Sequence, residues 1–223
     1  MSSSLVGSEM CIRDRPLKWR TAQNLLSILK SEGNKSYAEL NDGKRTKQNP
    51  KQYHNLRLMF AIGFYTGFRI SDILNIKWDT ITDEKNKAVK EFTLTEKKTK
   101  KSRTVQVNKD LAKIINETYK ADTPTDYNDF VFTDKKSQIN KPISVQAANK
   151  RIKKVFTQFE IDAANPSSHT LRKTFGMRVY EKYGQSENAL ITLSQIFNHS
   201  SIAMTRKYIG ITQEKIKAVY LNL

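Results

Sequence analysis

One stretch of the chain, residues 90–107, alternates between apolar and polar side chains, whereas the apolar residues elsewhere repeat with helical spacing. Phe92 and Leu94 alternate with polar neighbours in its first half. Val105 and Val107 do the same in its second half, after a run of basic residues. A period of two indicates β-strands. The pattern therefore predicts a β-hairpin with a very basic tip.

Apolar residues spaced by three or four positions predict helices along most of the remaining chain. Residues 31–50 are instead polar and contain glycine, which predicts a loop. Residues 129–133 are compatible with either a strand or a buried turn. These patterns predict an α+β fold, a mainly helical domain with a small antiparallel β-sheet. The expected helices cover residues 17–30, 54–67, 70–78, 109–119, 144–159, 169–183, 188–197, 202–208 and 213–220.

The domain organisation predicted from these patterns is simple. No internal repeat, Gly/Ser linker or low-complexity tract interrupts the chain, so one domain is expected to cover residues 16–223. Residues 1–15 are expected to be a non-native or disordered leader. They begin with polar residues and lack the cationic start of a signal peptide.

The chain is strongly basic, with 39 Lys and Arg against 22 Asp and Glu and a formal net charge of +17. Such a balance is typical of proteins that bind nucleic acid through phosphate contacts. A general solubility charge is the alternative. The single cysteine, Cys11, excludes an intramolecular disulfide, and no apolar run has the length of a membrane span. A reducing, cytosolic location is expected.

Arg69 follows Gly67 closely, at the start of a predicted helix. A guanidinium placed just after a glycine turn can project into a cleft. Asp72 lies one helical turn further on, where it can brace neighbouring groups. The alternative is a local surface ion pair between Arg69 and Asp72.

His169 and Arg172 lie three residues apart and therefore share a helix face. Ser167 and Ser168 mark the start of that helix, whose amide groups favour an anion. Such a pair also arises easily by chance. Further along, His199 is followed by Tyr208, which alone would indicate only a solvated helix ending in an amphipathic tyrosine.

These residues, in this order, resemble the tyrosine recombinase or phage integrase family over residues 56–211. The chain has only three histidines, and two of them fall within the resembling motifs. Lys98 best matches the family's hairpin lysine, with Lys97, Lys100 and Lys101 as alternatives. The resemblance implies that the catalytic residues are Arg69, Lys98, His169, Arg172, His199 and Tyr208, with Asp72 in support.

The family's chemistry implies that Tyr208 attacks a DNA phosphate and forms a 3′-phosphotyrosyl link. The arginines and His199 would bind the phosphate oxygens, and His169 would take the tyrosine proton. Lys98 would protonate the departing 5′-hydroxyl. No metal, ATP or other cofactor is expected, since no phosphate-binding loop or carboxylate cluster is evident. The expected DNA-binding residues are Lys97, Lys100, Lys101, Arg103 and Lys173.

Three departures from the family pattern are mild. Asn198 replaces a frequent glycine, Lys173 stands where histidine is frequent, and Asp72 stands where Glu is common. None removes a reactive group. Residues 16–55 are too short for the helical N-terminal domain that members commonly carry. A fragment, or a naturally short member such as the fimbrial-switch invertases, would account for this.

The resemblance also implies partners and competing functions. Double-stranded DNA at specific recombination sites is the expected partner. The protein would form a homo-tetramer on DNA and could be a monomer in solution. It would act in the bacterial nucleoid or be encoded by a phage or other mobile element. Residues 209–223 would exchange between subunits or pack on their own domain. A type IB topoisomerase is one alternative, but it usually has a lysine where His169 stands. A non-catalytic DNA-binding module is another, although no reactive position is damaged.

Overall fold

The computed structural model describes residues 14–42, 48–133, 140–211 and 220–221, and its contacts divide the chain into two compact units. One unit contains residues 23–148, and we call it the hairpin unit. The other contains residues 1–22 and 149–223, and we call it the tyrosine unit. The sequence patterns did not indicate this division of the expected single domain.

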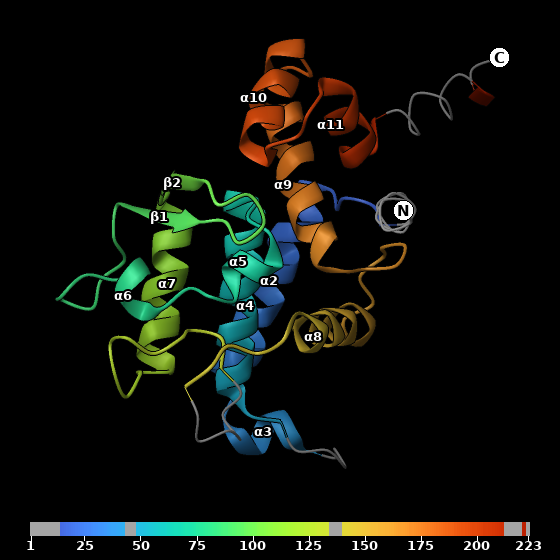
Figure 1. Cartoon of the computed structure of the whole chain (residues 1–223). Helices are drawn as coiled ribbons and strands as arrows, with labels where there is room; N and C mark the ends of the chain where they lie inside the picture. Colours follow the sequence, from blue (N-terminus) through green and yellow to red (C-terminus); the bar gives the residue numbers. More distant parts are fainter. Residues whose placement is uncertain (1–13, 43–47, 134–139, 212–219, 222–223) are drawn as a thin grey trace, which may run out of the picture. The chain divides into compact units, whose positions relative to one another are not determined.

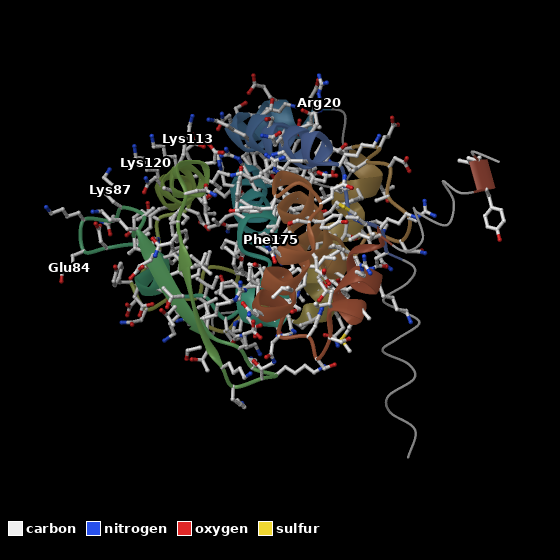
Figure 2. All side chains as sticks on the ribbon, turned by 90° about the horizontal axis from the view of Figure 1, so that it is seen from above. Arg20, Glu84, Lys87, Lys113, Lys120 and Phe175 are labelled. Carbon is white, nitrogen blue, oxygen red and sulfur yellow. The ribbon has the colours of Figure 1, made fainter. Side chains whose placement is uncertain are left out.

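Two packed helices, α4 (Pro50–Thr66) and α7 (Lys109–Ala121), form the core of the hairpin unit (Figure 1). The side chain of Asn49 caps the start of α4 by accepting the Lys51 N–H at 2.9 Å. Gly67 ends the helix in the left-handed conformation, with φ of 63°, which favours glycine. The predicted helix and glycine turn are thus confirmed. Away from α4, exposed lysines project from α7 (Figure 2).

The loop predicted at residues 31–50 is wrong in its first part. Helix α2 (Trp19–Asn34) continues past residue 30, and a short helix α3 (Tyr37–Asn41) follows. Ser36 and Glu39 form a reciprocal capping box at the start of α3. A serine followed three residues later by a glutamate is a sequence pattern that indicates a helix start. The helix is further stabilised by Leu40, which is fully buried.

The helix predicted at residues 70–78 is also wrong in extent. It is divided into α5 (Ile70–Ile73) and α6 (Trp78–Ile81). Between them the backbone pairs with a distant segment, because the Val131 N–H donates to the Ile76 carbonyl at 3.0 Å. Residues 129–133 therefore make isolated bridges rather than a strand of their own. Pairing across the fold overrides the local helical pattern here.

The predicted hairpin is confirmed. Strands β1 (Glu91–Thr95) and β2 (Ser102–Gln106) pair antiparallel, with Phe92 opposite Val105. Phe92 is buried and its ring centroid lies 6.2 Å from that of Phe68. One face of the hairpin thus packs against the core of the hairpin unit, whereas the lysines at its tip are exposed.

In the tyrosine unit, α9 (Ser168–Lys182), α10 (Glu187–Phe197) and α11 (Ile202–Ile209) pack together (Figure 1). They confirm the predicted helices to within one residue at every end, as does α8 (Val145–Gln158). The helix predicted at 213–220 falls almost entirely outside the described residues.

Close helix packing in the tyrosine unit depends on Gly176 of α9. A Cβ atom at this position would lie 2.7 Å from the Ile209 Cγ2 atom and 3.0 Å from the Phe197 ring. Only a residue without a side chain permits this approach. The shared core of α9, α10 and α11 includes Leu190, Leu193, Phe197, Tyr208, Ile209 and Ile211. None of the helices in the described part of the chain is long and apolar enough to cross a membrane.

Candidate active site

Tyr208 lies near the end of α11, a helix with well-defined ends. The Ser201 side chain caps its start by accepting the Met204 N–H at 3.1 Å, and Gly210 ends it with φ of 85°. Tyr208 is only 8% exposed, and its ring packs edge-on against Phe197 at 5.5 Å between centroids. Its phenol is therefore held in one orientation by the unit's core.

His169 brings a ring nitrogen to this phenol. It is the second residue of α9, where the Ser167 hydroxyl accepts its backbone N–H at 3.1 Å. Its Nδ1 atom lies 3.3 Å from the Tyr208 hydroxyl oxygen. An imidazole with an unprotonated Nδ1 can accept a phenolic proton at this position. The predicted association of His169 with Tyr208 is thus present in the geometry.

Arg172 lies one turn further along α9 and is 3% exposed. Its Nη2 atom donates to the Phe197 carbonyl at 3.0 Å, and its guanidinium carbon lies 4.4 Å from the centre of the Phe197 ring. These contacts fasten the guanidinium to the end of α10. A charge held in this way can bind an anion with little reorganisation.

His199 joins the same group because α10 ends just before it. Asn198 adopts the left-handed conformation, with φ of 51°, and the His199 N–H donates to the Ser194 carbonyl at 2.9 Å. Asparagine tolerates this conformation better than most residues, which explains how it can replace glycine here. The His199 Nδ1 atom lies 3.0 Å from the Thr205 hydroxyl, and the ring lies 5.2 Å from that of Tyr208.

The second group of predicted residues lies in the hairpin unit. Arg69 immediately precedes α5, and its Nη1 atom donates to the carboxylate of Glu96. Asp72, on α5, is 4% exposed and accepts the Lys97 N–H at 3.0 Å. Because Asp72 is buried, the alternative of a surface ion pair is wrong. Its carboxylate thus holds the backbone at the start of the hairpin tip, and its supporting role in catalysis stays a prediction.

Glu96 is a residue that the sequence reasoning missed. Its carboxylate, 3% exposed, also accepts the Thr99 hydroxyl at 3.1 Å and lies 3.8 Å from Arg103 Nε. A lone carboxylate directly before a run of lysines was the available signal. The sequence showed the charge, but its burial between two arginines depends on the fold.

The hairpin tip presents Lys97, Lys98, Lys100 and Lys101 as exposed side chains. Arg103 is partly buried instead, with Nη1 donating to the Thr66 carbonyl at 2.8 Å. The four exposed lysines therefore remain candidates for DNA contact or proton transfer. Arg103 is already engaged with the protein.

Lys173 needs a correction, because it is 2% exposed and cannot contribute a surface contact with DNA. Helix α9 is buried on most sides at this level, so position 173 has no solvent-facing side. The Lys173 Nζ atom donates to the Asp14 carbonyl at 2.6 Å and lies 5.5 Å from the centre of the Tyr208 ring. Asp14, within the expected leader, also accepts the Ser167 hydroxyl.

The predicted site residues thus form two groups, one in each unit. His169, Arg172, His199 and Tyr208 come together in the tyrosine unit, whereas Arg69, Asp72 and the tip lysines belong to the hairpin unit. Within the described ranges, no cluster of three or more His, Cys, Asp or Glu side chains is arranged to hold a metal ion.

Comparison with known proteins places this arrangement in a family. Residues 34–215 match the model of the phage integrase family, and the chain belongs to that family. It is 32% identical over 162 residues to a probable integrase/recombinase, YoeC, of Bacillus subtilis (strain 168). That match covers 73% of this chain and 81% of YoeC.

Solved structures have the same fold. The XerA recombinase matches with a TM-score of 0.62 and 16% identity, over 93% of this chain and 64% of XerA. The XerH recombinase, in a post-cleavage complex with a palindromic difH substrate, matches with a TM-score of 0.61 and 15% identity. That match covers 92% of this chain and 52% of XerH. The chain thus spans only about half to two thirds of these solved chains.

Proposed function

We propose that this protein is a site-specific DNA recombinase that cleaves and rejoins strands through a 3′-phosphotyrosyl intermediate. The main support for this proposal is the distance of 3.3 Å between His169 Nδ1 and the Tyr208 hydroxyl, with Arg172 and His199 in the same group. A nucleophile, a base and a cation within one rigid unit are suited to phosphoryl transfer. Membership of the phage integrase family supports this assignment.

In the proposed first step, the Tyr208 oxygen attacks the scissile phosphorus while His169 accepts its proton. A free phenol has a pKa of about 10, so unaided tyrosine is almost entirely protonated at pH 7. An O–P bond to tyrosine forms as the bond to the 5′-oxygen breaks. The phosphotyrosyl link conserves the energy of the broken bond, so rejoining needs no nucleotide cofactor and no metal.

The negative charge that grows on the phosphate oxygens would be stabilised by cationic side chains from both groups of site residues. Arg172 and His199 would donate to the non-bridging oxygens, and Arg69 would do the same once both units act on one phosphate. Lys98 would protonate the 5′-oxygen as it leaves. The exposed position of this lysine at the hairpin tip suits a group that must reach DNA.

The expected substrate is double-stranded DNA, and the expected assembly is a tetramer on two sites. A net charge of +17 supports tight, salt-sensitive phosphate binding. The XerH structures contain difH DNA, which is consistent with such a substrate class. The proposed location is the cytoplasm, in the nucleoid or with a mobile element.

The test is covalent capture. The protein is incubated with nicked duplexes of randomised sequence, and DNA that stays attached in sodium dodecyl sulfate is recovered and sequenced. The proposal predicts an adduct on a recurring sequence, and Tyr208→Phe should bind that duplex but form none. DNA binding without any adduct would identify a non-catalytic DNA-binding module instead. Relaxation of supercoiled plasmid without joining of two sites would identify a topoisomerase, which His169 disfavours.

A further inference from the structure

We propose that Glu96 is a positioning residue that orients both Arg69 and the loop carrying Lys98. This inference rests on the proposed function. The Glu96 carboxylate is 3% exposed and lies directly after β1. It accepts one hydrogen bond from Arg69 Nη1 and another, at 3.1 Å, from the Thr99 hydroxyl. One buried carboxylate thus joins an arginine and a loop residue of the proposed site.

The backbone of Glu96 also closes the loop. Its N–H donates to the Lys101 carbonyl at 3.0 Å, and its carbonyl accepts the Lys100 N–H at 2.9 Å. Lys100 has φ of 58°, so the chain reverses tightly at this point. The same residue therefore closes the turn with its backbone and binds Arg69 and Thr99 with its side chain.

Lys98 lies between two residues that are each bound by a carboxylate of the hairpin unit. The N–H of Lys97 is bound by Asp72, and the hydroxyl of Thr99 is bound by Glu96. Both of these carboxylates are buried, whereas the Lys98 side chain is exposed. An anchored backbone with an exposed side chain is what a proton donor requires, because the ammonium must reach DNA from a defined base.

Electrostatics exclude a direct role for Glu96 at the phosphate. Its negative charge would oppose the charge that grows on the phosphate oxygens in the transition state. Burial of a carboxylate is also costly unless cations compensate it, and Arg69 and Arg103 do so here. A benefit to cleavage must therefore come through the groups that Glu96 holds.

Glu96→Gln tests the loop half of the inference without DNA. The substitution keeps size and one acceptor oxygen but removes the charge. Amide hydrogen exchange across residues 97–101 should become about tenfold faster, since a charge-assisted anchor is lost. Glu91→Gln is the matched control, because it removes an exposed carboxylate from the same hairpin. Exchange unchanged in Glu96→Gln would overturn this half.

Single-turnover cleavage of the captured duplex tests the catalytic half. Glu96→Gln should slow cleavage on the order of 100-fold at saturating DNA without weakening binding. A 5′-bridging phosphorothiolate, whose thiolate leaves without an acid, should rescue this variant only in part, because Arg69 remains misplaced. Thr99→Ala disturbs only the loop, so the same substrate should rescue it fully. Circular dichroism verifies that both variants are folded.

The outcomes separate the two proposals. Cleavage by Glu96→Gln at the wild-type rate would overturn the role of Glu96 and leave the recombinase proposal intact. Full rescue by the phosphorothiolate would remove Arg69 from the inference. If wild-type protein forms no adduct, the proposed function fails, and the exchange measurement still decides whether Glu96 holds the loop.

Discussion

The Nδ1 atom of His169 lies 3.3 Å from the hydroxyl oxygen of Tyr208, although the two residues belong to different helices, α9 and α11. The Ser167 cap sets the position of the histidine, and the packing of Phe197 sets that of the tyrosine. A base and a nucleophile are thereby aligned before any DNA is present. This preorganisation is the basis of the first prediction.

His169→Ala should lower the single-turnover cleavage rate by about 10²- to 10⁴-fold, because the Tyr208 proton loses its acceptor. DNA affinity should change little, since His169 is not among the proposed phosphate ligands. Added imidazole should restore part of the rate by occupying the space left by the side chain. His54→Gln, which changes a histidine of the hairpin unit, serves as the control. A rate unaffected by His169→Ala would assign proton removal to another group.

Lys98→Ala should slow cleavage by about 10²- to 10⁴-fold, since the 5′-oxygen would leave without a proton. A 5′-bridging phosphorothiolate should abolish this defect. Lys97→Ala removes an equal charge from the adjacent exposed position and should weaken binding at low salt with little effect on the rate of cleavage. If Lys97→Ala instead slows cleavage and the phosphorothiolate restores its rate, the general acid is Lys97.

Thr205→Val should slow cleavage roughly five- to tenfold, because His199 loses the hydroxyl 3.0 Å from its Nδ1 atom. Thr205 is fully buried, and valine has nearly the same shape, so packing should be preserved. Thr192→Val, which removes an exposed hydroxyl from α10, is the matched control. Equal rates for the two variants would show that Thr205 does not orient the imidazole.

Gly176→Ala should destabilise the protein by about 1–3 kcal/mol, because the new methyl group would overlap Ile209 and the Phe197 ring. Ile209 directly follows Tyr208, so displacement of α11 should also reduce adduct formation. Urea denaturation followed by circular dichroism measures the first effect, and covalent capture measures the second. Gly176→Ser should be worse than Gly176→Ala, and the reverse order would argue against overlap as the cause.

Stability should fall below about pH 6.5 because of His54. Burial lowers the pKa of this imidazole, aided by Arg57, against the opposing effects of the Gly33 carbonyl and Glu117. Its Nε2 atom lies 3.0 Å from that carbonyl. As the pH falls, the unfolded chain therefore binds a proton at this histidine before the folded chain does. Stability is lost between the unfolded pKa of about 6.5 and the lower folded pKa.

His54→Gln keeps an N–H donor for Gly33 but removes the titration. Urea midpoints at pH 7.5 and 5.5 should differ less in this variant than in the wild type, where the slope is at most about 1.4 kcal/mol per pH unit. Glu117 does not titrate between these two pH values, because its pKa is lowered from an ordinary value of about 4.5. In Glu117 the effect of burial is outweighed by hydrogen bonds from Lys30 and Arg57. Equal slopes would exclude His54.

Much of the local structure could be predicted from the sequence, because helical spacing, capping residues and glycines act over a few neighbouring positions. The hairpin and the helices that carry His169, Arg172 and Tyr208 are in this class. The helix predicted at residues 70–78 failed because Ile76 pairs with Val131, far along the chain. Such long-range pairing leaves no periodic signal in the segment itself.

Most of the helices, the hairpin, the basic charge and the candidate site residues could be inferred from the sequence alone. Which of the charges are buried depended on the fold instead. It placed Glu96 between Arg69 and Arg103, and it removed Lys173 from the surface to a position beside Tyr208. The physical reason is that a charge's role depends on its solvent exposure and its partners, and both are set by chain segments distant in sequence.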